Sequence, residues 1–237
     1  LNIFLMTISQ LCHLQRGAFM GNDKITEKKR LKMTKLYDAA YELFTSNGVH
    51  NTIIDDIVKR AGVAKGTFYL YWKEKKDWVD KIILKKSSAL LNNALEAVEK
   101  EQQAKDLDFQ QCVIFFVDYL IEFFKKDVKL LELIYKNLSW ELYEKVINYA
   151  EIDNVRKLFI VNFMNEGGNG EAAKQRLYII VSMVGSVCYN SIVLKCPYQL
   201  NEIKPELYHS IKQILTWSIH SNKRGCFVCF PRLLKLL

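Results

Sequence analysis

The chain has 237 residues, half of them hydrophobic, with only three prolines and ten glycines. A chain of this length buries a sizeable core and has room for one large or two modest domains. Its abundance of Leu, Ile, Lys and Glu favours an all-α fold. The four histidines lack catalytic or metal-binding spacing and no glycine-rich phosphate loop occurs, so we expect no enzyme and no catalytic residue.

The positive charge is unevenly distributed along the chain. The net charge is +8, and residues 1–105 carry 18 lysines and arginines against 12 acidic residues, whereas residues 106–237 carry 16 against 14. A basic excess in one half indicates a nucleic-acid-binding domain there. A generic solvated surface explains the charge but not its placement.

The cysteines indicate a reducing compartment. They show no disulfide-framework spacing and lie at positions 12, 112, 188, 196, 226 and 229. We therefore expect free thiols in a cytoplasmic protein. Cys226 and Cys229 form a lone C-x-x-C pair without a second pair, so the sequence predicts no metal site and no cofactor.

The beginning of the chain is expected to be an extension ahead of the first helix. Residues 1–19 lack the basic segment of a signal peptide, and Met20 followed by GNDKITEKKR looks like a natural start. We expect residues 1–23 to be disordered. A helix is predicted from Thr26 to Ser46, ended by the Asn-Gly pair that follows. Its inward face is predicted to consist of Leu36, Ala39, Ala40, Leu43 and Phe44.

A basic cluster lies at the start of this helix. It consists of Lys24, Lys28, Lys29, Arg30, Lys32 and Lys35. Two interpretations of this cluster remain open. It contacts the DNA backbone or the minor groove, or it is only the solvated start of a helix.

Residues 52–78 have the pattern of a helix-turn-helix. A short helix is predicted over residues 53–60, a turn over 61–63 and a second helix over 64–71. Gly62 suits the turn because glycine alone enters the left-handed region without a steric cost.

The second helix of this motif exposes hydrogen-bonding groups, with Phe68 as its apolar anchor. Lysine and tyrosine bind phosphates, glycine lets a backbone approach, and threonine offers a hydroxyl and a methyl group to base edges. The predicted DNA-binding residues are Thr52, Lys65, Gly66, Thr67, Tyr69, Tyr71 and Lys75. Thr52 is also expected to cap the first short helix, and Lys75 to bind the DNA backbone at a helix N-terminus. A small surface helix with incidental polarity is the alternative.

Residues 35–82 resemble the DNA-binding domain of the TetR family of bacterial transcriptional regulators. The segments LFTSNGVHNT and IDDIVKRAGVAKGTFYLYW, and the lysines after them, keep the family's order and spacing. Two positions depart from the pattern. Ala64 replaces a serine or threonine that commonly caps the recognition helix, so a bond of about 1 kcal/mol is missing. Glu74 stands where a small capping residue often precedes the next helix.

The resemblance implies an all-α protein with an N-terminal three-helix helix-turn-helix domain. We expect this DNA-binding domain over residues 24–80, a helical ligand-binding and dimerisation domain over residues 81–221, and a tail over residues 222–237. A linking helix is predicted over residues 75–103. The polar stretch 100–108 is interpreted as a domain boundary.

Beyond this stretch the pattern predicts only helices. An apolar helix is centred on residues 113–124, and further helical segments cover residues 127–150 and 153–165. A loop is predicted at residues 167–171, and a last helix over residues 206–221.

Residues 177–194 have the length and apolarity of a membrane span. A stripe of Ser182, Gly185, Ser186 and Asn190 along one face favours instead a helix buried against other helices. In the family the last two long helices form a four-helix bundle with a second subunit. The resemblance therefore implies a homodimer with no membrane partner.

Aromatic residues of the second half are candidates for a ligand pocket. The predicted ligand-binding residues are Phe116, Tyr119, Leu120, Phe159, Phe163 and Tyr189. Such residues suit an apolar or aromatic ligand. Plain core packing is the alternative, and it is the more frequent role of aromatic stripes.

These features predict a ligand-responsive transcriptional regulator. We expect a repressor that binds a palindromic operator in double-stranded DNA as a dimer and is released by a small apolar or aromatic effector. The alternative is an architectural or partner-recruiting DNA-binding protein without an effector.

Overall fold

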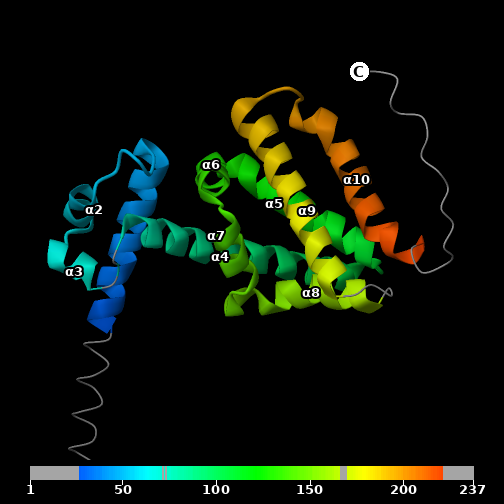
Figure 1. The fold of residues 1–237 in the computed structure, drawn as a ribbon, viewed down its shortest axis with the longest axis horizontal. Helices are drawn as coiled ribbons and strands as arrows, with labels where there is room; N and C mark the ends of the chain where they lie inside the picture. Colours follow the sequence, from blue (N-terminus) through cyan, green and yellow to red (C-terminus); the bar gives the residue numbers. More distant parts are fainter. Residues whose placement is uncertain (1–26, 71, 73, 166–169, 221–237) are drawn as a thin grey trace, which may run out of the picture. The chain divides into compact units, whose positions relative to one another are not determined.

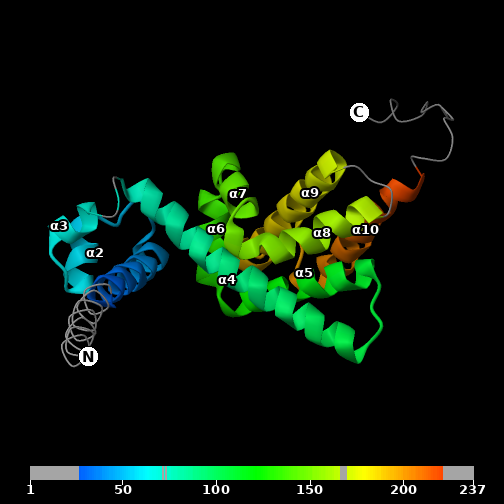
Figure 2. The same ribbon diagram turned by 90° about the horizontal axis from the view of Figure 1, so that it is seen from below.

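The computed structural model describes residues 27–70, 72, 74–165 and 170–220, and every regular element in these ranges is helical. The predicted all-α fold is thereby confirmed. The chain divides into two compact units, Leu1–Ile83 and Leu84–Leu237. The division falls inside α4 (Lys75–Ala104), a single long helix that begins in the first unit and ends in the second (Figures 1 and 2). The expected N-terminal extension and C-terminal tail lie outside the described residues.

The first unit contains a helix described over residues 27–47, α2 (Ile54–Ala61), α3 (Lys65–Tyr69) and the start of α4. The inward face predicted for the first helix is confirmed, since Leu36, Ala39, Ala40, Leu43 and Phe44 are all buried. The five basic residues of the predicted cluster that are described, from Lys28 to Lys35, are exposed. Both interpretations of that cluster therefore remain open.

Two glycines shape the turns of this unit as the sequence predicts. Gly62 ends α2 with φ +65°, and its N–H donates to the carbonyls of Val58 and Lys59. Gly48 follows the first helix with φ +81°. Both lie in the left-handed region that glycine enters without strain, which suits glycine to these two turns.

Aromatic rings fill the core of the first unit. Phe68 of α3 is fully buried, with its ring 4.9 Å from that of Trp78 on α4. Trp72 stacks on Trp78 with 4.8 Å between ring centroids, and Phe44 of the first helix meets Trp78 edge-on. The anchoring role predicted for Phe68 is confirmed. Its partners, two tryptophans beyond the recognition helix, hold α3 against the start of α4.

The second unit is a layered bundle of helices around one apolar core. After α4 its elements are α5 (Phe109–Lys126), α6 (Val128–Asn137), α7 (Trp140–Ile147), the 3-10 turn η1 (Ala150–Ile152), α8 (Asp153–Asn165), α9 (Gly170–Cys188), the π-helical η2 (Tyr189–Leu194) and α10 (Leu200–His220). In the stretch 100–108, residues 100–104 form the end of α4 and residues 105–108 connect it to α5, all within this unit. Its interpretation as a domain boundary was wrong, because its polarity reflects a helix end on the surface.

Side-chain caps explain where these helices begin. Asp108 and Gln111 form a reciprocal capping box at the start of α5, and the Asp127 carboxylate accepts from the Leu130 N–H at the start of α6. The predicted segment 127–150 is broken in two, since the Ser139 hydroxyl accepts from the Leu142 N–H and begins α7.

The helices α9 and α10 pack side by side (Figure 1). One face of α9 is buried through Leu177, Ile180, Val184 and Cys188. The small-residue stripe is not, because Ser182 is exposed and the other three positions are only half-buried. Residues 170–194 are long and apolar enough to cross a membrane, a criterion that the core helix of a soluble protein also meets. Within one chain the stripe therefore lacks the packing predicted for it.

Candidate nucleic-acid interface and cavity

The outer face of α3 carries the groups predicted to contact DNA. Lys65, Gly66 and Tyr69 are exposed and Thr67 is half-buried, and a side chain at Gly66 would meet open space. The predicted residue Tyr71 lies outside the described residues. Sequence reasoning missed Leu70, whose side chain is 79% exposed beside Tyr69. An exposed leucine at this position suits contact with a thymine methyl group, and its only signal was its place between two tyrosines.

The single lysine of α3 is held by an acidic residue of α2. The Lys65 Nζ lies 2.5 Å from the Asp55 carboxylate, and both side chains are more than half exposed. The hydrogen bond to Asp55 is the main cause of a raised Lys65 pKa. The ammonium is therefore charged at neutral pH and lies where a solvent-borne anion can reach it. As the sequence indicates, Ala64 provides no side-chain cap for α3.

Thr52 does not have the position predicted for it. The residue preceding α2 is Ile53, which makes no side-chain cap, and Thr52 is fully buried. Its hydroxyl donates to the carbonyls of Gly48 (2.9 Å) and Leu43 (3.2 Å). Both the helix cap and the phosphate contact predicted for Thr52 are contradicted, because its hydroxyl is turned inward and used by the loop after the first helix.

Lys75 also points to this loop. Its Nζ donates to the carbonyls of Val49 (2.8 Å), Thr52 (3.1 Å) and His50 (3.4 Å). An ammonium group has three donors and no acceptor, so these three carbonyls account for its donors. The side chain fastens the start of α4 to the loop rather than extending toward solvent, which contradicts the predicted contact with the DNA backbone.

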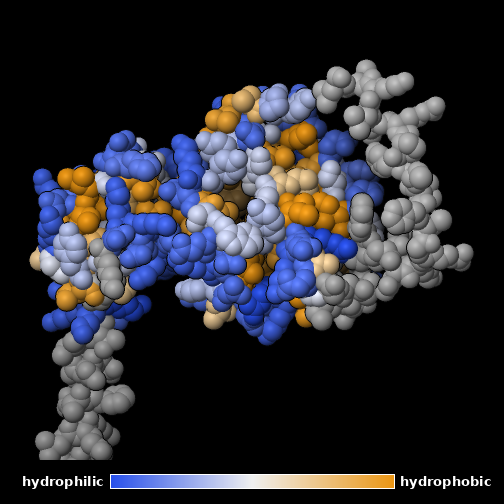
Figure 3. Space-filling model, in the orientation of Figure 1, coloured by the Kyte–Doolittle hydropathy of each residue, from blue (hydrophilic) through white to orange (hydrophobic). Residues whose placement is uncertain are grey.

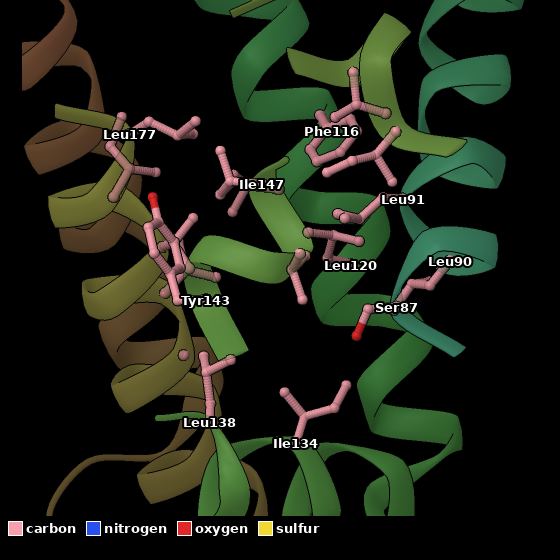
Figure 4. Close-up of a pocket in the computed structure, with 18 of the residues that line it drawn as sticks. Ser87, Leu90, Leu91, Phe116, Leu120, Ile134, Leu138, Tyr143, Ile147 and Leu177 are labelled. Atoms are coloured by element: carbon pink, nitrogen blue, oxygen red, sulfur yellow. The ribbon is translucent and has the colours of Figure 1, made fainter. Parts of the chain in front are cut away.

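A cavity of about 190 Å³ lies within the second unit. Its wall comes from α4, α5, α6, α7, α8 and α9 and is almost entirely leucine, isoleucine, valine and phenylalanine. In Figure 4, Ser87, Leu90 and Leu91 lie on one side of the cavity, opposite Tyr143 and Leu177. Figure 3 shows the surface hollowed over this unit, with hydrophobic atoms inside.

The opening of the cavity follows from the exposure of its wall. Tyr135 and Leu138 line it and are nevertheless 40% and 38% exposed, so it reaches solvent beside the end of α6. Tyr143 lines the opposite side, where burial raises its pKa to about 12. Its phenol is therefore neutral at physiological pH and can only donate or accept a hydrogen bond.

Three of the six residues predicted to bind a ligand are in this wall. Phe116, Leu120 and Phe159 line the cavity, with the two phenylalanine rings edge to face at 5.5 Å. Tyr119 packs at the margin of the core, and Tyr189 stacks on Tyr135 at 4.1 Å without being part of the wall. The side chain of the sixth residue, Phe163, lies outside the described residues.

One charged side chain of the wall escaped sequence reasoning. Arg156 lines the cavity from the first turn of α8, pairs with Asp153 and donates to the Ile147 carbonyl at the end of α7. A lone arginine among charges on a predicted helix carries no signal that it faces a cavity.

The described residues contain no cluster of acidic, histidine and cysteine side chains that suits a metal ion. Three cysteines are described, and all are free thiols: Cys112 and Cys188 are buried and Cys196 is exposed. Burial raises the Cys188 pKa to about 12, which makes this thiol unreactive at neutral pH.

Comparison with known proteins identifies the first unit. Residues 36–81 match the family described as bacterial regulatory proteins, tetR family. The fatty acid metabolism regulator protein of Bacillus subtilis (strain 168) is 35% identical over 80 residues, an alignment that covers 34% of this chain and 41% of that relative. The chain thus spans less than half of that protein. YvdT, an HTH-type transcriptional regulator of the same organism, is 26% identical over 191 residues, covering 78% of this chain and 95% of the relative.

Solved structures share the fold of this chain over about three quarters of its length. FadR from Bacillus subtilis in complex with stearoyl-CoA superposes with a TM-score of 0.55 and 19% identity, over 79% of this chain and 100% of that one. FadR from Bacillus halodurans has a TM-score of 0.54 and 19% identity, over 76% and 94%. These relatives are transcriptional regulators rather than enzymes. With a helix-turn-helix unit that the tetR family model matches and an all-helical second unit, the chain is similar to the TetR family of transcriptional regulators.

Proposed function

We propose that the chain is a dimeric repressor whose operator binding is relieved by an effector in the cavity of the second unit. One observation carries this proposal: α4 belongs to both sites. Its first residue, Lys75, fastens the helix-turn-helix loop, and Ser87, Leu90 and Leu91 on the same helix line the cavity.

The DNA contact is proposed for the exposed part of α3. Lys65, Thr67 and Tyr69 would reach phosphates and base edges, with Leu70 as an additional apolar contact. Two such helices in a symmetric dimer, about 34–36 Å apart, would each bind one half of a palindrome.

A second copy of the chain is proposed to cover the outer face of α9. Ser182 and Ile179 are exposed there, as is Tyr178, while α10 packs beside α9 and offers a second helix to the same partner. The small-residue stripe that is unpacked within one chain suits close helix packing of this kind. The protein would act in the cytoplasm, where the chromosome lies.

The effector is proposed to be a molecule with a long apolar chain. The wall offers hydrophobic contacts nearly everywhere, and a related fold accommodates stearoyl-CoA. The effector can weaken DNA binding only by binding better to an arrangement in which the two α3 helices no longer fit successive grooves. Typical coupling energies are about 1–3 kcal/mol, or roughly 5- to 150-fold in affinity.

Fluorescence anisotropy tests this function directly. The purified chain would be titrated into labelled DNA from upstream of its own gene and into scrambled DNA, at two salt concentrations, with and without palmitoyl-CoA. Tighter binding to the upstream DNA that falls with salt and with ligand is the expected result. Equal binding to both DNAs, unaffected by ligand, would instead favour an architectural DNA-binding protein without an effector.

A further inference from the structure

Among the described residues that line the apolar cavity, Arg156 is the single charged one. Its side chain is 32% exposed, and its guanidinium lies 3.5 Å from the carbonyl of Ile147, which also lines the cavity. Placing a cation against apolar surface costs free energy unless polar partners compensate. Asp153 and the Ile147 carbonyl are the polar partners that the protein itself supplies at this position.

The charges around Arg156 do not cancel. Asp153 pairs with Arg156 through Oδ1 and with Lys157 through Oδ2, the latter at 2.6 Å. Two cations thus share one carboxylate, which leaves one positive charge over. The hydrogen bond from Lys157 is the main cause of the lowered Asp153 pKa, so this carboxylate remains paired when Arg156 turns to another acceptor. A guanidinium has five N–H donors, and the two contacts described use two of them.

The position of Arg156 relative to α4 is fixed by hydrogen bonds. Glu151, in the turn just before α8, accepts from the Ser88 hydroxyl (3.0 Å) through its carboxylate and from the Asn92 amide (2.7 Å) through its carbonyl. Both donors belong to α4, which also forms part of the cavity wall. The first turn of α8 is therefore held at a set place beside the cavity.

We propose that Arg156 binds the acidic head of an effector whose apolar chain fills the cavity. This inference rests on the proposed function and narrows its effector to a long-chain acid. Two sources share this chemistry: a free long-chain carboxylate, and an acyl thioester of a phosphate-bearing carrier such as coenzyme A. A planar guanidinium binds either oxyanion with charge-assisted hydrogen bonds.

Calorimetric titration of the full-length chain with palmitate, palmitoyl-CoA and hexadecanol, each below its micelle concentration, tests the proposal. Arg156→Met should weaken the binding of an acidic ligand at least tenfold, as expected for loss of a hydrogen bond to a charged group, and that of hexadecanol less than twofold. Lys174→Met is the control for loss of a positive charge. It removes a cation that pairs with Glu171, away from Asp153, from a side chain that is 60% exposed and outside the wall, so it should change every affinity less than twofold. Arg156→Gln, which keeps donors for the α7 carbonyl, repeats the test should the Met variant fail to fold.

The ligand arms separate the possible results. A selective loss for palmitate identifies a free acid, and a selective loss for palmitoyl-CoA identifies the conjugate; both support the proposal. Equal losses of affinity for hexadecanol and for the acids, or no loss of affinity, would overturn the proposal. Binding of hexadecanol alone by the wild-type chain would also overturn it, although the cavity would then still be an effector site. If the wild-type chain binds none of the three ligands, the proposal that an apolar effector occupies the cavity would be overturned as well.

Discussion

Replacing Lys75 by methionine should loosen the helix-turn-helix without removing a contact to DNA. Methionine keeps most of the length of the side chain but leaves the carbonyls of Val49, His50 and Thr52 without their shared donor. Hydrogen bonds to charged groups contribute about 1.5–3 kcal/mol when buried. Because Lys75 is half-buried and water can replace part of the donor, we expect a local loss of about 1.4 kcal/mol, or roughly a tenfold change in the opening equilibrium.

Two measurements separate this structural role from a phosphate contact. Hydrogen–deuterium exchange of the amides in residues 48–61 should accelerate about tenfold in the variant. The slope of log affinity against log salt should stay unchanged, because a lost phosphate contact lowers it by about 0.9 for each lysine and hence by about 1.8 for a dimer. Affinity for operator and random DNA should fall by similar factors.

Lys59→Met is the control for the charge itself. It removes an exposed lysine of α2 from the same unit and leaves the loop intact. Unchanged exchange together with a slope reduced by about 1.8 in Lys75→Met would refute the structural assignment and restore Lys75 as a phosphate contact.

Three further predictions follow from the same structure. Thr52→Val should lower the stability of the first unit to thermal unfolding by about 1–3 kcal/mol, because buried carbonyls lose their donor, and should leave the ratio of operator to random DNA affinity unchanged. Thr52→Ser keeps the hydroxyl and should lose less stability. Weaker DNA binding at unchanged stability would contradict the buried role of Thr52. Asp55→Asn should tighten DNA binding at low salt because it releases Lys65. Asp56→Asn makes an equal charge change in the same turn and should have a smaller effect on affinity. Equal effects of the two changes would show that only net charge matters. Among the described cysteines, Cys196 should be alkylated first at pH 8 in peptide mapping, because a pKa of about 12 leaves only about one Cys188 thiol in ten thousand ionised, and faster labelling of Cys188 would show that α9 opens.

Residue patterns predicted those parts of the fold that depend on local backbone and apolar spacing. The inward face of the first helix, the left-handed Gly62 and the anchor Phe68 follow from helical periodicity and from the conformational freedom of glycine. The break at Ser139 was missed, although serine is a frequent cap. The apolar residues on both sides of it continue a helical pattern, and periodicity alone does not reveal a change of axis.

The cavity was only half predictable because its wall is a tertiary property. Phe116 and Phe159 were found as aromatic residues on apolar faces. Ser87 and Arg156 are polar residues on helices where many of the other polar residues are exposed. Only the packing of α4 against η1 and α8 distinguishes them, and that packing depends on side chains far apart in the sequence, among them Ser88 and Glu151.

The errors at the DNA interface share one physical cause, the backbone of the loop before α2. Buried or half-buried carbonyls require donors, and this loop is not part of a helix that would supply them. The carbonyls of Asn47, Gly48 and Val49 accept from Asn51, Thr52 and Lys75, respectively. A hydroxyl or ammonium near a recognition helix therefore serves either the loop or the DNA, and its residue type does not decide which. Exposure does, and in the described part of this unit it favours the face of α3 from Lys65 to Leu70.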